Sequence, residues 1–303
     1  MVEAPDRRAE RRRGRTAWGT LLLLVAVVAA GGWLVALRRD VLASGFAHVD
    51  TARARLDVGP GWVDPRWEEE LRWSLAELPP PAADDRAALE DVARRVAAHS
   101  FVAAVEDLRV VWPDGLRVEL RLREPVACVH VGRHFLTVAE DGTLLSGRWP
   151  SPPARDAGFL PVLRVLDDLE RTGSRRPGAR LEEPAALDGL AIAASLWRDL
   201  PAAAQARLGR CVIDARRARA ASVEEPGARL LLEGERTVLF GRSPNLGEPG
   251  ELPVATKWAH VDAALRLLEP DGARDEAPEG LDWEVLDARW DRADLQPREP
   301  AGG

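Results

Sequence analysis

The 303-residue sequence contains no tyrosine, a single lysine against 41 arginines, and two cysteines. We attribute the missing tyrosine and the excess of arginine to coding bias rather than to function. Cys128 and Cys211 lie far apart in the sequence, so neither belongs to a closely spaced pair of the kind that binds zinc. In an oxidising compartment the two could form a disulfide, and the sequence leaves that question open.

Motifs for catalysis and for cofactor binding are also lacking. The segment 241–245, GRSPN, has a serine after an expected strand but not the second glycine of a nucleophile elbow. The turn 59–61 lacks the third glycine and the helix of a phosphate-binding loop. His130 and His134 have no third ligand within reach in the sequence, which favours an ordinary histidine pair over a metal site. We therefore expect no catalytic residues, no cofactor and no bound metal.

Charge is distributed unevenly along the chain, which has 42 basic and 49 acidic residues and a net charge of −7. Residues 1–39 hold eight arginines and three acids, so the remainder has 34 basic against 46 acidic residues, a net charge of −12. An acidic surface of this kind argues against nucleic acid or anionic lipid as its partner.

The longest uncharged run is the 22 residues of 16–37, TAWGTLLLLVAVVAAGGWLVAL. As a helix rising about 1.5 Å per residue, it would span a hydrocarbon core of roughly 30 Å. Six arginines precede the run and two follow it, a bias that predicts a cytoplasmic N-terminus. We expect a cytoplasmic basic tail over 1–15, one transmembrane helix over 16–37, and the remainder outside the cytoplasm. A cleavable signal peptide is the alternative, although its apolar region is usually only about 7 to 15 residues.

Beyond residue 45 the pattern predicts the order β-α-α-β-β. A loosely alternating strand over 48–58 precedes Asp64-Pro65, which suit the N-cap and the first position of a helix. One amphipathic helix is expected over 66–77 and a second from about residue 84 to 97, because apolar residues recur on one helical face of each.

The clearest alternation lies in the strand 116–123. Its apolar residues fall on one face and its charged residues on the other: Leu116, Val118, Leu120 and Leu122 against Arg117, Glu119, Arg121 and Arg123. With the strand 105–112 it forms a hairpin whose apolar face the two helices can cover. We expect a small α+β unit over residues 46–126, a size at which a domain can carry its own core.

Three short motifs mark the chain around this hairpin. Phe101-Val102 precede it, Trp112-Pro113 stand at its turn, and Glu124-Pro125-Val126-Ala127 follow it. Their order and placement resemble the POTRA domain of the FtsQ/DivIB cell-division proteins, which has a "WV"-like pair, a "WP" turn and an "E-x-P-V-A" exit. This chain departs from that pattern in having Phe101 for the first tryptophan and no residue between Glu124 and Pro125.

The resemblance continues past Ala127, although it weakens across 147–184. The similar segments are Leu160-Pro161-Val162-Leu163 ("lPxl"), Val238-Leu239-Phe240-Gly241 ("v-x-l-G"), Lys257 at the start of a helix ("K-l-x-x-l"), and Asp287-Ala288-Arg289-Trp290 ("D-L-R-aromatic", with Ala288 for the usual leucine). The resemblance implies a mixed β-rich FtsQ-type domain with flanking helices over 127–292. A disordered tail over 293–303 completes an α+β chain that begins with one transmembrane helix.

The resemblance also implies a function. It indicates a non-enzymatic scaffold of the bacterial division machinery, located in the cytoplasmic membrane at the division septum. Such a scaffold recruits FtsB- and FtsL-like membrane proteins and regulates septal peptidoglycan synthesis. The alternative is a POTRA-bearing component of a protein export or secretion apparatus, which the lack of repeated alternating segments of about 10 residues disfavours. An enzyme of the cell envelope is a third class, disfavoured because no catalytic group can be assembled.

The last expected strand, 283–290, is the candidate partner-binding edge. The Pro/Gly-rich tail 296–303 is expected not to add another strand, which would leave this one free to pair with a partner. Apolar and charged side chains are mixed on both of its faces, and the resemblance points to the same segment. The candidate partner-binding residues are Trp283, Val285, Leu286, Asp287, Arg289 and Trp290. Alternatively, the two tryptophans close the domain core and Asp287 pairs internally with Arg289.

The sequence has eleven tryptophans, and their positions divide them. Trp67 and Trp112 fall on apolar faces and are expected in the core. Trp62, Trp73 and Trp149 lie in loops or on polar faces, where an exposed aromatic side chain is a candidate anchor for a partner.

Overall fold

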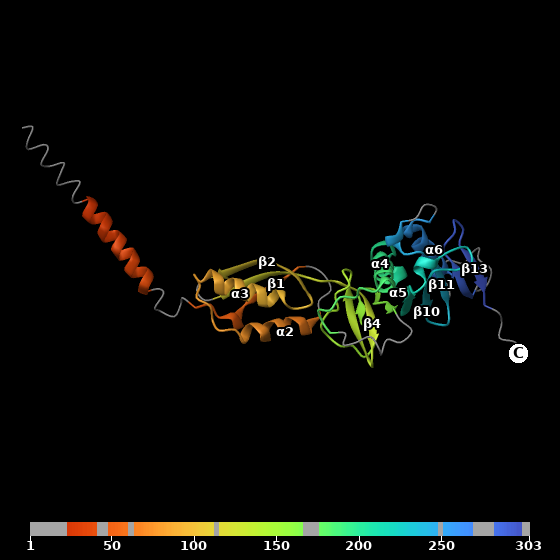
Figure 1. Cartoon of the computed structure of the whole chain (residues 1–303), viewed down its shortest axis with the longest axis horizontal. Coiled ribbons are helices and arrows are strands. Elements are labelled where there is room, and N and C mark those ends of the chain that lie inside the picture. Colours follow the sequence, from red (N-terminus) through yellow and green to blue (C-terminus); the bar gives the residue numbers. More distant parts are fainter. Residues whose placement is uncertain are drawn as a thin grey trace, which may run out of the picture.

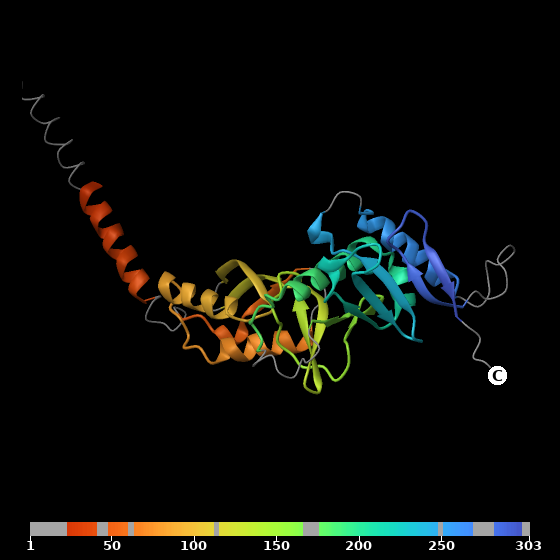
Figure 2. The same ribbon diagram turned by 45° about the vertical axis from the view of Figure 1, so that its right-hand side comes forward.

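The computed structural model describes residues 23–40, 48–59, 64–111, 115–165, 176–247, 251–268 and 282–298. After the helix 23–40, the described chain forms two modules that lie end to end in both views, the first orange to yellow and the second green to blue (Figures 1 and 2). Each module has its own cluster of buried apolar side chains.

The transmembrane helix expected over 16–37 is not supported. Among the described residues, no helix combines the length and the apolar character needed to cross a membrane. Residues 1–22, including the expected cytoplasmic tail, lie outside the described residues.

The first module has the β-α-α-β-β order that the sequence predicts. Its elements, after a short 3-10 turn at Thr51–Arg53, are β1 (Arg55–Val58), α2 (Pro65–Ala76), α3 (Arg86–Ala97), β2 (Val102–Val111) and β3 (Gly115–Leu122). The strands form one sheet in the order β1-β3-β2, with β1 parallel to β3 and β2 antiparallel to it. The expected turn at Trp112-Pro113 lies outside the described residues.

Local signals explain where the two helices begin. The Asp64 carboxylate accepts a hydrogen bond from the Arg66 amide at 3.1 Å, with Pro65 in the first turn, and Asp85 accepts one from the Ala88 amide at 3.0 Å. Trp67 of α2 is buried and stacks on Phe101, with ring centroids 4.9 Å apart. Leu116, Val118 and Leu120 of β3 lie in the same core.

The second module is built on one eight-stranded sheet. Its order is β13-β12-β11-β10-β9-β8-β4-β5. The strands are β4 (Pro125–Val131), β5 (His134–Ala139), β8 (Val162–Arg164), β9 (Cys211–Asp214), β10 (Ala228–Leu232), β11 (Thr237–Gly241), β12 (Trp283–Asp287) and β13 (Asp294–Pro297). Three helices accompany the sheet, α4 (Pro184–Asp199), α5 (Ala202–Leu208) and α6 (Val254–Arg266). Two-residue strands β6 (Ala154–Arg155) and β7 (Gly158–Phe159) form a separate hairpin, and 3-10 turns lie at Ala218–Ala220 and Pro244–Leu246.

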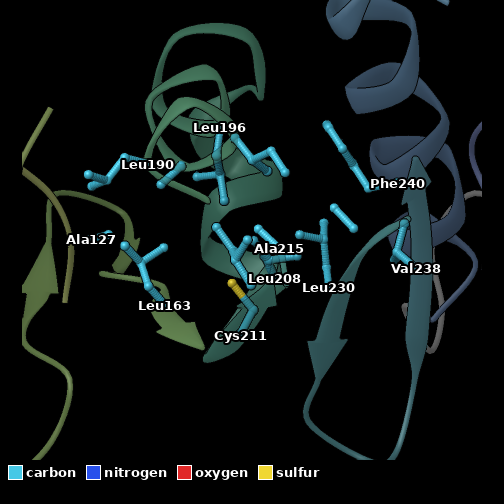
Figure 3. Close-up of a cluster of buried hydrophobic side chains, with 14 of the residues drawn as sticks. Ala127, Leu163, Leu190, Leu196, Leu208, Cys211, Ala215, Leu230, Val238 and Phe240 are labelled. Atoms are coloured by element: carbon cyan, nitrogen blue, oxygen red, sulfur yellow. The ribbon is translucent and has the colours of Figure 1, made fainter. Parts of the chain in front are cut away.

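The core of this module lies between α4 and the sheet (Figure 3). Leu190 and Leu196 of α4 face Leu163, Leu230 and other strand residues in a single buried cluster.

Cys128 and Cys211 are both buried and both free thiols. They belong to β4 and β9, and β8 lies between those strands, with Val162 paired to Cys128 on one side and to Val212 on the other. The disulfide that the sequence leaves open is therefore not formed. Burial raises the pKa of Cys211 to about 12 and also raises that of Cys128, so neither thiol is a reactive thiolate.

Direct contacts join the two modules. The Trp67 indole N–H donates to the Ser146 carbonyl at 2.9 Å, and the Arg66 guanidinium lies 4.1 Å from the centre of the Trp149 ring. Ala139 and Leu145 of the second module are buried in the core of the first. Trp149 is thus part of the junction, whereas Trp73 on α2 is 67% exposed. Trp62 and Trp112 lie outside the described residues.

Candidate partner-binding edge

The strand β12 lies inside the sheet and is not its edge. It pairs in parallel with β11, where Leu286 is opposite Val238, and antiparallel with β13, where Leu286 is opposite Leu295. The expectations that the tail adds no strand and is disordered from residue 293 are therefore wrong for Asp294–Pro297. Only the last residue of β13 is a proline, and an edge strand tolerates a proline because its outward side needs no N–H.

The two edges of the eight-stranded sheet differ. The outer side of β5 is occupied by the segment 143–149: the amides of Phe135 and Trp149 donate to each other's carbonyls at 2.8 and 3.0 Å, and the Leu145 amide donates to the Thr137 carbonyl at 2.9 Å. No described residue pairs with the outer side of β13. Within the described chain, β13 is therefore the open edge of this sheet.

The alternation of an antiparallel pair identifies which groups β13 offers. The Arg298 amide donates to the Asp282 carbonyl at 3.0 Å, and Val285 and Asp287 are opposite Gln296 and Asp294. Hydrogen-bonding groups alternate between the two sides of a strand, so Gln296 and Asp294 face β12 and Leu295 presents its N–H and C=O outward. Pro297 offers only a carbonyl. The open edge is short, with one outward N–H.

Two of the expected partner-binding residues are core residues. Trp283 and Leu286 are fully buried, and the Trp283 indole N–H donates to the Ala264 carbonyl of α6 at 3.1 Å. Val285 is half-buried between the neighbouring strands. The first two side chains cannot reach a partner while the domain is folded.

Asp287 and Arg289 form an internal ion pair at the end of β12. The guanidinium donates Nε to Oδ1 at 2.9 Å and Nη2 to Oδ2 at 2.7 Å, and the Trp290 indole N–H adds a hydrogen bond to Oδ2 at 3.1 Å. Burial acts to raise the pKa of Asp287, but the hydrogen bonds from Arg289 outweigh it and hold that pKa below its ordinary value. The same contact raises the pKa of Arg289.

Trp290 behaves differently from Trp283. Its side chain is 46% exposed, and the Arg289 guanidinium lies 5.4 Å from its ring centre. The strand itself ends at Asp287, three residues before Trp290, where the sequence predicts that it ends. The alternative assignment therefore holds for Trp283 and the ion pair, and Trp290 is the candidate residue left with a large accessible surface.

Segments distant in the sequence converge beside this ion pair. The only lysine, Lys257 at the start of α6, is fully buried and its ammonium group pairs with Glu251. Burial lowers the pKa of Lys257 below its ordinary value, and Glu251 opposes that shift. Gly241, at the end of β11, has a φ of +86°, and a Cβ there would lie 3.0 Å from Glu251 Oε1, 3.2 Å from Arg289 Cγ and 3.4 Å from Lys257 Nζ.

The convergence joins three motifs that the sequence shows separately. They are the end of β11 at Gly241, the start of α6 at Lys257, and the Asp287-Arg289 pair after β12. The sequence analysis missed β13, because the segment has only four residues, ends in Pro297 and runs into a Pro/Gly-rich tail. Residues 294–296 are thus candidate partner-binding residues that only the folded structure identifies.

Comparisons with known proteins add little. No known family matches the chain, and no curated protein matches its sequence. Among solved structures, the chain is similar to the major extracytoplasmic domain of the trans isomer of the cell-division protein DivIB from Geobacillus stearothermophilus. The match has 16% identity, covers 38% of this chain and 75% of that one, and has a TM-score of 0.22. A TM-score of 0.22 is too low for this likeness to establish a shared fold.

Proposed function

We propose that the chain is a non-enzymatic scaffold of the FtsQ/DivIB type, which recruits partner division proteins and regulates septal peptidoglycan synthesis. The observation that carries the proposal is the convergence of Gly241, Lys257 and the Asp287-Arg289 pair beside the open edge β13. These residues were identified in the sequence by their resemblance to one family. Their meeting at a single place in the fold supports reading the three motifs as one site.

The partner binds along β13 in this proposal. An open edge adds a strand by pairing its outward N–H and C=O groups with those of an extended segment. Leu295 supplies such a pair, and the exposed side chains of Gln296 on β13 and of Trp290 in the segment between β12 and β13 are available for further contacts. The proposed partners are FtsB- and FtsL-like proteins, and the proposed location is outside the cytoplasm at the division septum.

The ion pairs of the site support a structural role over proton transfer. The carboxylate of Asp287, whose pKa is lowered, is held by two hydrogen bonds from the Arg289 guanidinium. A carboxylate paired in this way stays ionised at neutral pH and fixes the chain. It is a poor general base because its pKa is far from the working pH.

Site-directed photo-crosslinking in cells tests the proposal. A photoreactive amino acid replacing Gln296, exposed on β13, should crosslink to an FtsB- or FtsL-like protein. The same amino acid replacing Glu90, exposed on α3, should not. Equal crosslinking from both positions would contradict the proposed edge. Crosslinks from position 296 to components of an export apparatus would support the alternative function.

A further inference from the structure

The hairpin of β4 and β5 carries a pocket at the opposite end of the sheet from β13. Its turn is Gly132-Arg133, with Val131 opposite His134, and Gly132 has a φ of +59°. A positive φ at the first central residue is what a two-residue type II′ turn requires, and glycine adopts it without strain. The turn therefore presents Arg133 and His134 at the tip of the hairpin, where a pocket of about 340 Å³ opens.

The pocket has a cationic rim and an apolar wall. Arg133, His134 and Arg148 line it together with Val131, Leu136 and Pro177. Arg148 is held in place by its neighbour Trp149, whose backbone exchanges two hydrogen bonds with Phe135 of β5. The Arg148 carbonyl also accepts a hydrogen bond from the Arg66 side chain at 3.4 Å, which ties this rim to the first module.

The arginines of this pocket differ from most others in the described chain. Arginines elsewhere typically pair with a carboxylate, as Arg72 does with Glu68 at 2.7 Å and Arg216 with Asp214 at 2.7 Å. Within the described residues, the guanidinium groups of Arg133 and Arg148 contact no carboxylate and no carbonyl. In a chain with a net charge of −7, two unpaired cations on one pocket rim are a local excess of positive charge.

We propose that this pocket binds a small organic anion, whose carboxylate or phosphate group is held by Arg133 and Arg148 and whose apolar part lies against Val131 and Leu136. A guanidinium group matches the geometry of both anionic groups, because its N–H donors form a planar fork. The volume falls at the lower end of the range of about 300 to 1,000 Å³ for small-ligand sites, which fits a short ligand. The site is distinct from the β13 edge, since β5 and β13 are the two opposite edges of the sheet.

Isothermal titration calorimetry on the full chain tests the pocket with three probes. N-acetyl-L-leucine carries a carboxylate and an apolar side chain, its amide lacks the charge, and inorganic phosphate lacks the apolar part. We expect saturable binding of N-acetyl-L-leucine and binding at least about tenfold weaker for the amide, because the amide forfeits the charge-assisted hydrogen bonds. Phosphate should bind more weakly than N-acetyl-L-leucine because it leaves the apolar wall uncovered.

Three variants locate the binding. Arg133→Gln and Arg148→Gln should each weaken binding of N-acetyl-L-leucine by about tenfold or more while thermal melts show an unchanged fold. Arg292→Gln is the matched control, because Arg292 is exposed, unpaired within the described chain, and lies between β12 and β13.

Three outcomes would overturn the proposal: no binding of N-acetyl-L-leucine at millimolar concentration, unchanged binding in both pocket variants, or an equal loss in Arg292→Gln. Phosphate binding as tight as that of N-acetyl-L-leucine would overturn the assigned role of the apolar wall.

Discussion

The Arg289 guanidinium donates two parallel hydrogen bonds, of 2.9 and 2.7 Å, to the carboxylate of Asp287, two residues earlier in the chain. The pair stands where β12 ends and turns the chain toward β13. Arg289 also donates to the Ser222 carbonyl at 2.9 Å, so the pair links the end of β12 to the segment before β10. Loss of this ion pair should therefore lower the free energy of unfolding of the second module.

The first prediction concerns this pair and its dependence on pH. Asp287→Asn should lower the free energy of unfolding at pH 7 by about 1 to 3 kcal/mol, because a charged acceptor of four hydrogen bonds is lost. The folded-state pKa of Asp287 lies below the roughly 3.9 of an unfolded chain. The stabilisation is therefore complete above about pH 4 and is lost as the pH falls through the folded-state value.

Urea melts at pH 7 and pH 3 measure this effect. The difference between the variant and the parent should shrink at pH 3, because below the unfolded-state pKa the carboxyl group of the unfolded parent is protonated and the stabilisation from the lowered pKa of Asp287 begins to be lost. Asp291→Asn is the control, since Asp291 is exposed and has no ion pair within the described chain. A difference of the same size at both pH values would show that the charge of Asp287 is not what stabilises the turn.

The second prediction concerns the core of the first module. Leu120 on β3 is 2% exposed, whereas Arg121 faces solvent and pairs with Glu106 at 3.1 Å. Leu120→Ala should cost about 2 to 5 kcal/mol of unfolding free energy and Arg121→Ala about 0.5 kcal/mol or less. Denaturant melts of the full chain provide the comparison, and similar losses for the two variants would refute the register of β3.

The elements that the sequence predicts are those with strong local signals. The Asp64-Pro65 pair marks the start of α2, and the unbroken alternation from Leu116 to Leu122 fixes both β3 and its buried face. Each of these depends on residues close together in the chain, which periodicity can detect.

The errors concern features that depend on distant residues. Which strand forms the edge of a sheet depends on which strands pair with each other. The order β13-β12-β11-β10-β9-β8-β4-β5 therefore cannot be predicted from the hydrophobic periodicity of any single strand. The mixed faces of β12 suggested a partner from outside, whereas Leu286 and Val285 pack between β11 and β13. Partner binding at this end of the sheet stays a prediction, now placed on β13 and Trp290.

The third prediction concerns the two thiols. Because Cys128 and Cys211 are buried and lie on either side of β8, native protein without reductant should react with a thiol reagent slowly. The raised pKa values leave almost no thiolate at pH 7, which slows the reaction further. After denaturation, two thiols per chain should react at once. A count of zero thiols in the denatured, unreduced chain would mean that the pair is bridged.

The fourth prediction separates the two tryptophans around β12. Trp283→Ala removes a fully buried indole and should cost about 3 to 5 kcal/mol of unfolding free energy. Trp290→Ala removes a half-exposed ring and one hydrogen bond to Asp287 and should cost about 1 kcal/mol. Thermal melts measure both. Capture of an FtsB- or FtsL-like partner should fall in the folded Trp290→Ala variant, and capture at the parental level would remove Trp290 from the interface.

The last prediction tests strand addition at β13. Leu295 carries the one outward N–H of this edge, so Leu295→Pro removes the donor that a partner strand would use, while the bonds of Asp294 and Gln296 to β12 stay. Leu295→Ala is the matched control, because it also removes the half-buried side chain but keeps the N–H. We expect both variants to melt at similar temperatures, since both lose the same packing.

Partner capture should then differ between the two. Leu295→Ala should bind an FtsB- or FtsL-like protein within a few-fold of the parent, and Leu295→Pro should bind at least about tenfold more weakly, because a main-chain hydrogen bond to the partner is lost and the ring obstructs the approach of its strand. Equal capture by the two folded variants would show that the partner does not pair with the main chain of β13. Equal loss in both would assign the contact to the leucine side chain, and β13 would then act as a packing surface without adding a strand.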